Sequence, residues 1–281
     1  MSAPSTDNTI VLVTGGNTGI GYAITEALLG GDGVKSSAKY TVIITSRTLA
    51  KSTQAAGALR SDSSVAEAFK SGFEVVPAQL DIDNDVEIER IVKSVGDQYG
   101  RLDVLVNNAG VQHDSSVLRG EMTIREAFAQ TFDTNVSSTH LLTSALIPLL
   151  LKSSSPRIVF VSSGIGSLAE HSWDGIPINQ SPPAGWPKKP TFNITTYRTT
   201  KTAMNMMILE WIRVLKNDNV KIHIIDPGLL ATNLGGSTPD QLRQMGAREP
   251  IEGGRFIKSV IEGKRDGDMG KMIRDGAVVP W

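Results

Sequence analysis

The chain has 281 residues, with 28 lysines plus arginines, 29 aspartates plus glutamates, 27 glycines and no cysteine. This length suits one α/β domain with insertions and a sizeable core, while the lack of cysteine excludes disulfides, thiolate nucleophiles and cysteine-ligated metal centres. A formal net charge of −1 argues against a nucleic-acid partner, because nucleic-acid binders normally present a strongly basic face.

Short β-branched runs alternate with stretches of helical periodicity along the chain. Strands are expected over residues 10–14, 41–45, 73–76, 104–106, 157–161 and 221–225. Helices are expected over residues 22–29, 86–95, 124–147 and 197–215. Near-continuous Val/Ile runs are typical of strands buried on both faces of a parallel sheet. The alternation predicts a single-domain, Rossmann-type doubly wound α/β fold over residues 1–281, with about seven strands.

The sequence shows no signal for export or for membrane insertion. Residues 1–9 lack the basic and apolar regions of a secretory signal. The most apolar stretch, residues 141–151, is shorter than the ~20 residues of a membrane span. We therefore expect a cytoplasmic protein without a membrane partner. Residues 275–281 leave open whether a last strand closes the edge of the sheet.

A glycine-rich turn follows the first expected strand and precedes a helix. Gly15, Gly19 and Gly21 let the chain turn sharply and let a diphosphate approach the backbone, and the helix N-terminus favours its negative charge. Tyr22 stands where a Walker-type loop needs lysine, which favours a dinucleotide over a nucleoside triphosphate. Three neighbouring residues are expected along the phosphates: Asn17, Thr18 and Ile20.

The end of the second expected strand indicates the type of dinucleotide. NAD is normally held there by an acidic residue on the ribose hydroxyls. This chain has Ser46 and Arg47 instead, a small donor and a cation suited to a 2′-phosphate. The pattern predicts NADP(H) as the cofactor.

Further motifs follow in order along residues 10–232. They are Asn-Asn-Ala-Gly at 107–110, Asn135, the pair Ser162-Ser163, Tyr197-x-x-x-Lys201 and Pro227-Gly228. Together with the glycine spacing, they resemble the short-chain dehydrogenase/reductase family, and its carbonyl-reductase-like branch in particular. Taken singly, each of these residues could also belong to an ordinary helix or turn. Such local roles do not explain why all of the motifs occur in the order found in the family.

The Tyr-x-x-x-Lys pair suits carbonyl reduction, which needs a proton donor at the developing alkoxide. Lys201 lies one helical turn after Tyr197, and its charge is expected to lower the pKa of the phenol. The resemblance implies that Lys201 also bonds the nicotinamide ribose and that Ser163, rather than Ser162, bonds the carbonyl oxygen. It further implies that Asn135 supports a proton-relay water.

The resemblance also assigns cofactor contacts outside the glycine-rich turn. It places Asp81 and Ile82 at the adenine, and Asn108 as a residue that steadies the central sheet. Along the adenosine half it places Ala109 and Gly110. At the nicotinamide amide and diphosphate it places the Pro-Gly-x-x-x-Thr run, represented by Pro227, Gly228, Leu229 and Thr232.

Two segments are candidates for substrate binding. Ser163 and Tyr197 are 34 positions apart, far more than in compact members of the family, and residues 172–194 account for the excess. The resemblance implies that such an insertion borders the substrate pocket and obstructs a tetramer interface, which favours a monomer or homodimer. Its apolar side chains are expected to shape the pocket, although a surface decoration stays possible: Trp173, Ile176, Trp186 and Phe192. The second candidate is a glycine-hinged lid at residues 229–250.

The remaining polar residues suggest no metal. The four histidines show no metal-ligand spacing. His113-Asp114 suits either a substrate contact or, more simply, a solvated loop pair. The chain is therefore expected to reduce a ketone or aldehyde to an alcohol with NADPH, acting on a small molecule such as a bulky biosynthetic intermediate. Oxidation of an alcohol with NADP⁺, a non-redox reaction and a cofactor-sensing role stay open as alternatives.

Overall fold

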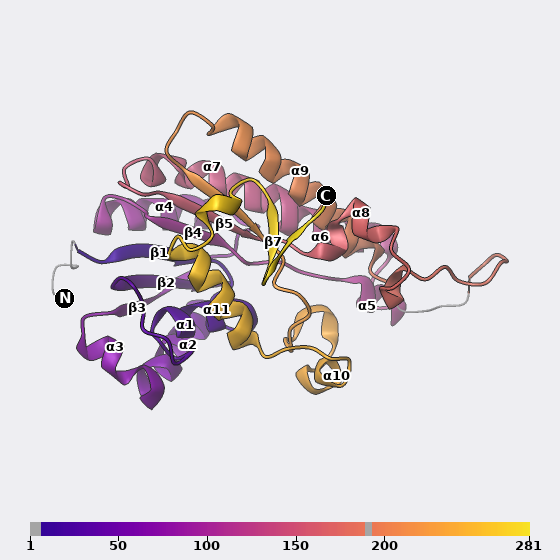
Figure 1. Cartoon of the computed structure of the whole chain (residues 1–281), viewed down its shortest axis with the longest axis horizontal. Helices are drawn as coiled ribbons and strands as arrows, with labels where there is room; N and C mark the ends of the chain where they lie inside the picture. Colours follow the sequence, from indigo (N-terminus) through magenta and orange to yellow (C-terminus); the bar gives the residue numbers. More distant parts are fainter. Residues whose placement is uncertain (1–6, 189–192) are drawn as a thin grey trace.

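The computed structural model describes residues 7–188 and 193–281. Its centre is an eight-stranded sheet in the order β3-β2-β1-β4-β5-β6-β7-β8 (Figure 1). The strands are β1 (Thr9–Val13), β2 (Tyr40–Ser46), β3 (Glu74–Gln79), β4 (Val104–Asn107), β5 (Arg157–Val161), β6 (Lys221–Ile225), β7 (Met272–Arg274) and β8 (Ala277–Val279). Strands β1 to β7 pair in parallel, and β8 closes the edge antiparallel to β7.

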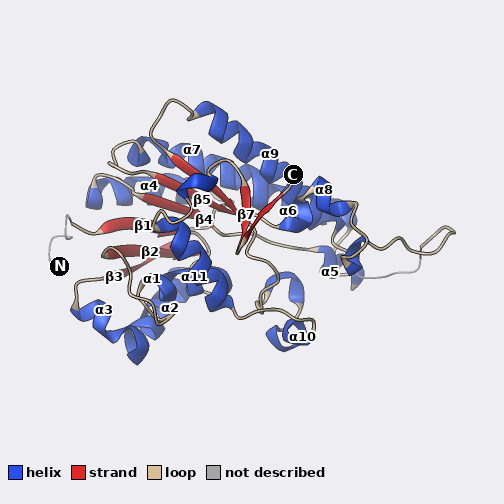
Figure 2. Ribbon diagram, viewed as in Figure 1, coloured by secondary structure: helices blue, strands red, loops and turns tan. Residues whose placement is uncertain are grey.

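Helices cover both faces of the sheet (Figures 1 and 2). One layer holds α1 (Gly19–Leu28), α2 (Leu49–Ser61), α3 (Ala66–Lys70) and α11 (Pro250–Ile261). The other holds α4 (Asp85–Tyr99), α7 (Thr139–Leu150) and α9 (Thr195–Val214). Alternate residues of β1 face the two cores, because successive strand side chains point to opposite sides. Ile10 and Leu12 pack with the second layer, whereas Val11 and Val13 pack with the first.

Three further short helices lie beyond the carboxyl ends of the central strands, toward the right in Figure 1. They are α5 (Asp114–Leu118), α8 (Leu168–His171) and α10 (Pro239–Gln244). In a doubly wound sheet, ligands bind outside these ends, where the strand order reverses. Here the order reverses between β1 and β4.

The predicted fold class is confirmed, with two differences in detail. The sheet has eight strands rather than about seven, because residues 277–279 form the edge strand that the sequence left open. The single helix expected over 124–147 is α6 (Ile124–Phe132), a π-helical segment (Asp133–Ser138) and then α7. Side-chain periodicity hardly distinguishes one widened turn from a regular helix, and such turns frequently mark functional sites.

No helix within residues 7–188 and 193–281 is both long and apolar enough to cross a bilayer.

A buried polar cluster lies where β5 and β6 begin. His223 is fully buried, and its Nε2 lies 2.6 Å from Nη1 of Arg157. Asp266 accepts hydrogen bonds from Arg157 and Lys221, both at 2.6 Å. These bonds outweigh burial and hold the pKa of Asp266 at about 2. Burial, reinforced by the charge of Arg157, lowers the pKa of His223 to about 4, so the imidazole is neutral in the folded state.

The free energy of unfolding should therefore fall in acid. A histidine in the unfolded chain binds a proton near pH ~6.5, whereas folded His223 binds it only near pH 4. Between these values the unfolded state takes up the proton, which costs on the order of 3 kcal/mol of stability. Urea unfolding of the wild type from pH 7 to pH 4 should show this slope, and His223→Gln should flatten it. His171→Gln, at an exposed histidine, serves as the control. Equal slopes in the wild type and His223→Gln would contradict the assignment.

Candidate active site

The glycine-rich turn has the backbone geometry that a diphosphate needs. Gly15 and Gly19 have φ values of 61° and 54°, in the left-handed region that favours glycine. A Cβ at Gly21 would collide with the Gly15 carbonyl oxygen and lie 2.7 Å from Nδ2 of Asn108. Helix α1 begins in this turn, and the side chain of Thr18 accepts no hydrogen bond from its first amides. These N–H groups therefore fit the phosphates of a dinucleotide.

Thr14 joins the glycine-rich turn to the Asn-Asn-Ala-Gly loop. Its hydroxyl accepts hydrogen bonds from the backbone N–H groups of Asn108 and Ala109, both at 2.9 Å. The same hydroxyl donates to the Val106 carbonyl at 3.2 Å, and Asn108 Nδ2 donates to the Thr14 carbonyl at 2.8 Å. Asn108 thus fixes the two loops to each other. The sequence analysis assigned no role to Thr14.

The segment after β6 reaches the same place. A Cβ at Gly19 would lie 3.4 Å from the methyl group of Thr232, so the two predicted cofactor segments are in contact. Gly228 has a φ of 73°, and Pro227 before it is buried. Leu229 is half exposed.

The predicted adenosine contacts follow β2 and β3. Ser46 is buried, and its hydroxyl donates to the Thr48 carbonyl at 2.7 Å. Arg47 is exposed, and its guanidinium has no hydrogen bond or ion pair with any described residue. Asp81 is half-buried and Ile82 is buried. Of these groups, the Arg47 guanidinium is the one left open to an anion.

Tyr197 and Lys201 are both buried on α9, against the end of β5. The Lys201 ammonium donates to the Val161 carbonyl at 2.9 Å and lies 5.5 Å from the centre of the Tyr197 ring. The Tyr197 hydroxyl makes no hydrogen bond to the described part of the chain. A Cβ at Gly166 would lie 2.8 Å from Lys201 backbone and side-chain atoms, so the loop after β5 packs directly on α9.

The two serines after β5 differ in their environment. The Ser162 hydroxyl is buried and donates to Oδ1 of Asn205 on α9 at 2.6 Å. Ser163 is half-buried, and its hydroxyl has no hydrogen-bond partner within the described ranges. Only Ser163 therefore keeps its hydroxyl free for a ligand, in keeping with the choice of Ser163 from the resemblance.

Burial sets the protonation of the Tyr–Lys pair. It raises the pKa of Tyr197 well above the ordinary value, and the negative charge of Asp226 adds to this shift. Burial lowers the pKa of Lys201 to about 8, against the opposing effect of Asp226. The expectation that the pKa of the phenol is lowered is wrong for this structure, because desolvation of the phenolate and the charge of Asp226 set the direction of the shift. Tyr197 is thus held in its protonated form.

Asn135 lies in the π-helical segment and is almost fully buried. Its side chain pairs with the backbone of Val111, accepting from the N–H at 2.8 Å and donating to the carbonyl at 2.9 Å. Its amide also donates to the Thr200 hydroxyl at 3.1 Å. Asn135 therefore links the loop after β4, where Gly110 packs against it, to the turn of α9 between Tyr197 and Lys201. Its support of a relay water stays a prediction.

For Asp114, the simpler expectation of a solvated loop residue is wrong. Asp114 is buried rather than solvated, and its carboxylate lies at the start of α9. It accepts hydrogen bonds from the Thr196 N–H at 2.9 Å, the Thr196 hydroxyl at 2.7 Å and the Tyr197 N–H at 3.1 Å. A carboxylate at a helix N-terminus satisfies its free N–H groups and favours its dipole. The contact spans more than 80 residues, so no local pattern could reveal it. His113 beside it is half-buried.

The insertion does not form the expected apolar pocket. It runs away from the sheet at the right in Figure 1, where Trp173 is 61% exposed and Trp186 is 89% exposed. Ile176 is half-buried, and Phe192 lies outside the described residues. The many prolines deprive this segment of backbone donors for a sheet or a long helix, and a single 3-10 turn at Pro177–Asn179 is its regular structure within the described residues after α8. The exposure of Trp173 and Trp186 fits the alternative, a surface decoration, better than the expected pocket.

The predicted lid contains α10 and packs on the loop after β4. A Cβ at Gly235 would collide with the side chain of Gln112, and one at Gly236 would lie 3.3 Å from Arg119. Both glycines have positive φ, as a sharp reversal requires. Closure over a substrate stays a prediction.

Comparison with known proteins decides the family. Residues 9–175 match the short chain dehydrogenase family. The chain is 37% identical over 280 residues to the short-chain dehydrogenase/reductase tropE of Talaromyces stipitatus, covering 98% of both chains. It is 36% identical to eupG of a Phoma species, covering 97% of both. The chain belongs to the short-chain dehydrogenase/reductase family. The predicted family is thereby confirmed.

Solved structures show the same fold for this short-chain dehydrogenase/reductase. NADPH-bound carbonyl reductase from chicken fatty liver aligns with a TM-score of 0.70 and 21% identity, over 98% of this chain and 100% of that one. The alcohol dehydrogenase of Thermococcus sibiricus, complexed with 5-hydroxy-NADP, aligns with a TM-score of 0.71 and 19% identity over 97% of both chains.

Loss of the Asp114 carboxylate should loosen the start of α9 in this short-chain dehydrogenase/reductase. Asp114→Ala leaves two buried N–H groups without their acceptor and should lower the free energy of unfolding by about 2–3 kcal/mol. Asp114→Asn keeps one accepting oxygen and should cost less. Urea unfolding measures both, with Asp174→Ala on the exposed part of the insertion as the control. If Asp114→Ala is as stable as the control, the carboxylate does not anchor the helix.

Proposed function

We propose that this protein reduces a ketone or aldehyde to the alcohol, with NADPH as hydride donor and Tyr197 as proton donor. The observation that carries the proposal is the joint burial of Tyr197 and Lys201 against the end of β5. The carboxyl end of β5 lies on the same side of the sheet as the carboxyl end of β1, where the glycine-rich turn begins. The family membership supports an oxidoreductase.

The chemistry follows from the protonation of these groups. NADPH, when bound, supplies the hydride that adds to the carbonyl carbon. Tyr197 gives its proton to the carbonyl oxygen as the alkoxide develops, and burial keeps the phenol protonated until then. The Ser163 hydroxyl, free of other partners, donates to the same oxygen and holds it near the phenol. This proton transfer completes the alcohol, and the resulting tyrosinate then regains a proton from solvent.

Lys201 has two functions in this proposal. Its ammonium, with a pKa of about 8, is mostly charged at neutral pH and favours the tyrosinate that forms after proton transfer. By the family resemblance, it also bonds the ribose of the nicotinamide. The Val161 carbonyl, 2.9 Å from Nζ, fixes its position for both.

The preference for NADP(H) rests on Arg47. Its exposed and unpaired guanidinium follows β2, where a 2′-phosphate would lie, and Ser46 replaces the acidic residue that NAD requires. Two solved relatives of the same fold carry NADPH or 5-hydroxy-NADP. For the substrate, we propose a bulky carbonyl compound bordered by the predicted lid at residues 229–250.

Removal of the phenolic hydroxyl should abolish proton donation and leave the cofactor site intact. Tyr197→Phe should lower kcat/KM for carbonyl reduction by roughly 10²–10⁴-fold, while the NADPH dissociation constant changes little. NADPH oxidation across a panel of ketones and aldehydes gives the first quantity, and fluorescence titration gives the second. Turnover that survives Tyr197→Phe would rule out Tyr197 as the donor. A wild type that binds NADPH but turns over only alcohols with NADP⁺, or no substrate at all, would favour the alternatives.

Removal of the Arg47 cation should act on one cofactor only. Arg47→Ala should weaken NADPH binding by about 10–100-fold, because a charge-assisted pair with a phosphate is lost, and should leave NADH binding nearly unchanged. Fluorescence titration with both cofactors measures the difference. Arg90→Ala, at an exposed arginine on α4, is the matched control. Equal losses for the two cofactors would exclude Arg47 as the phosphate ligand.

A further inference from the structure

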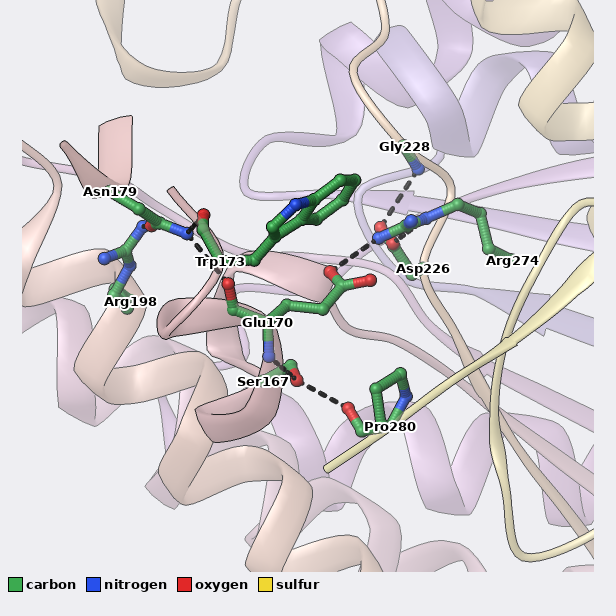
Figure 3. A network of polar contacts seen from close by, with 9 residues as sticks. All are labelled: Ser167, Glu170, Trp173, Asn179, Arg198, Asp226, Gly228, Arg274 and Pro280. Atoms are coloured by element: carbon green, nitrogen blue, oxygen red, sulfur yellow. Dashed lines mark hydrogen bonds and ion pairs between the residues drawn. The ribbon is translucent and has the colours of Figure 1, made fainter. Parts of the chain in front are cut away.

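A cluster of three charged residues joins β6, β7 and α8 (Figure 3). Arg274, at the end of β7, donates from Nε to Oδ2 of Asp226 at 2.6 Å and from Nη2 to Oε2 of Glu170 at 2.9 Å. Asp226 follows β6 and is buried, and Glu170 lies on α8. Arg274 therefore bridges two carboxylates from different parts of the chain.

The cluster contacts two of the proposed active-site loops directly. Oδ1 of Asp226 accepts a hydrogen bond from the Gly228 N–H at 3.0 Å, which shapes the Pro-Gly turn after β6. A Cβ at Gly164 would collide with Nη2 of Arg274 and lie 2.6 Å from Oδ2 of Asp226. The residue after Ser163 thus rests on the ion pair without room for a side chain.

The third connection leads to the insertion. The carbonyl oxygens of Glu170 and Trp173 both accept from Nδ2 of Asn179, at 2.8 and 3.1 Å. Oδ1 of Asn179 accepts from Arg198, the residue after Tyr197, at 2.7 Å. The base of the insertion is therefore connected both to the cluster and to α9 (Figure 3).

The end of the chain holds this arrangement in place. The Ser167 hydroxyl donates to the Pro280 carbonyl at 2.5 Å, and the Ala169 N–H donates to the Trp281 carbonyl at 2.8 Å. The β7–β8 hairpin that supplies Arg274 is thus itself attached to α8.

Charged groups face Asp226 from several elements. Arg274 faces it from β7, and Tyr197 and Lys201 from α9. On the far side of the Pro-Gly turn, Arg248 donates to the Pro227 carbonyl at 3.0 Å and also lies 3.6 Å from Asp275. Burial dominates the protonation of the Tyr–Lys pair, but the negative charge of Asp226 raises the pKa of both groups.

We propose that Arg274 is a positioning residue of the active site, which neutralises Asp226 beside the Tyr–Lys pair and fixes the Ser163 loop, the Pro227–Gly228 turn and the insertion relative to one another. This inference rests on the proposed function of Tyr197 as proton donor. Arg274 itself touches neither Tyr197 nor Ser163 through any hydrogen bond among the described residues, so its effect passes through Asp226, Gly164 and Glu170.

The test is a double-mutant cycle that removes the charges of Arg274 and Asp226, with the pH profile of carbonyl reduction as the readout. Arg274→Gln leaves the Asp226 charge unpaired, so the proton donor should become a weaker acid. The kcat/KM of this variant for carbonyl reduction should fall about tenfold. The alkaline limb of its pH profile, which deprotonation of Lys201 sets, should move up by about 1 pH unit. Adding Asp226→Asn should return the limb to the wild-type position or below. Arg274→Lys keeps the positive charge but cannot bond Asp226 and Glu170 in the same way. Its alkaline limb should stay at the wild-type pH, and part of the lost rate should return.

Two controls separate positioning from general damage. Arg213→Gln breaks an exposed ion pair on α9 and should leave the profile unchanged. If Arg274→Gln fails to fold, Asp226→Asn alone carries the test, because it preserves shape and should move the limb to lower pH. A limb that stays in place in both variants, or a shift that persists in the double variant, would overturn the proposal.

The same variants distinguish this proposal from the proposed function. If the wild type reduces no carbonyl, the function fails, but NADPH binding still reports the Lys201 charge. Loss of NADPH affinity should then follow deprotonation near pH 8 in the wild type, at higher pH in Arg274→Gln, and near the wild-type value in the double variant. Identical pH dependence of NADPH binding in all of them would refute the inference about Arg274 independently of turnover.

Discussion

The hydrogen bond from the Lys201 ammonium to the Val161 carbonyl is the contact on which the active site depends. It ties α9 to the end of β5 and buries a cation next to a phenol. A buried ammonium is costly unless its hydrogen bonds are satisfied, so α9 is held in one position on the sheet. The close approach of Gly166 to Lys201 and the bond from Ser162 to Asn205 belong to the same interface. The free hydroxyls of Ser163 and Tyr197 are consequences of that packing.

Around this interface, single polar side chains join loops that are distant in sequence. Thr14 joins the glycine-rich turn to the loop after β4, Asn135 joins that loop to α9, and Asp114 anchors the first turn of α9. Each contributes hydrogen bonds to backbone N–H groups, which would otherwise be buried without a partner. These polar contacts therefore hold the base of the site together.

Much of this could be predicted from the sequence, and the limits have a physical cause. The strands follow from β-branched runs, and the motif residues follow from their spacing, because both are local patterns. Asp114 and Thr14 bond partners more than 80 residues away, which only the assembled sheet brings together. The sign of the shift in the pKa of Tyr197 was predicted wrongly for the same reason. The attraction of Lys201 is visible in the spacing, whereas desolvation depends on how completely α9 is covered.

The most direct test of this account is the titration of the Lys201 ammonium by NMR of side-chain-labelled lysines, since burial of this charge underlies the geometry of the site. One lysine resonance should titrate with a pKa near 8 and should disappear in Lys201→Met. The same resonance should stay in place in a variant of an exposed lysine, Lys70→Met. If the resonance lost in Lys201→Met titrates at the ordinary lysine value near ~10.4, the ammonium is solvated and the buried Tyr–Lys pair does not exist as described.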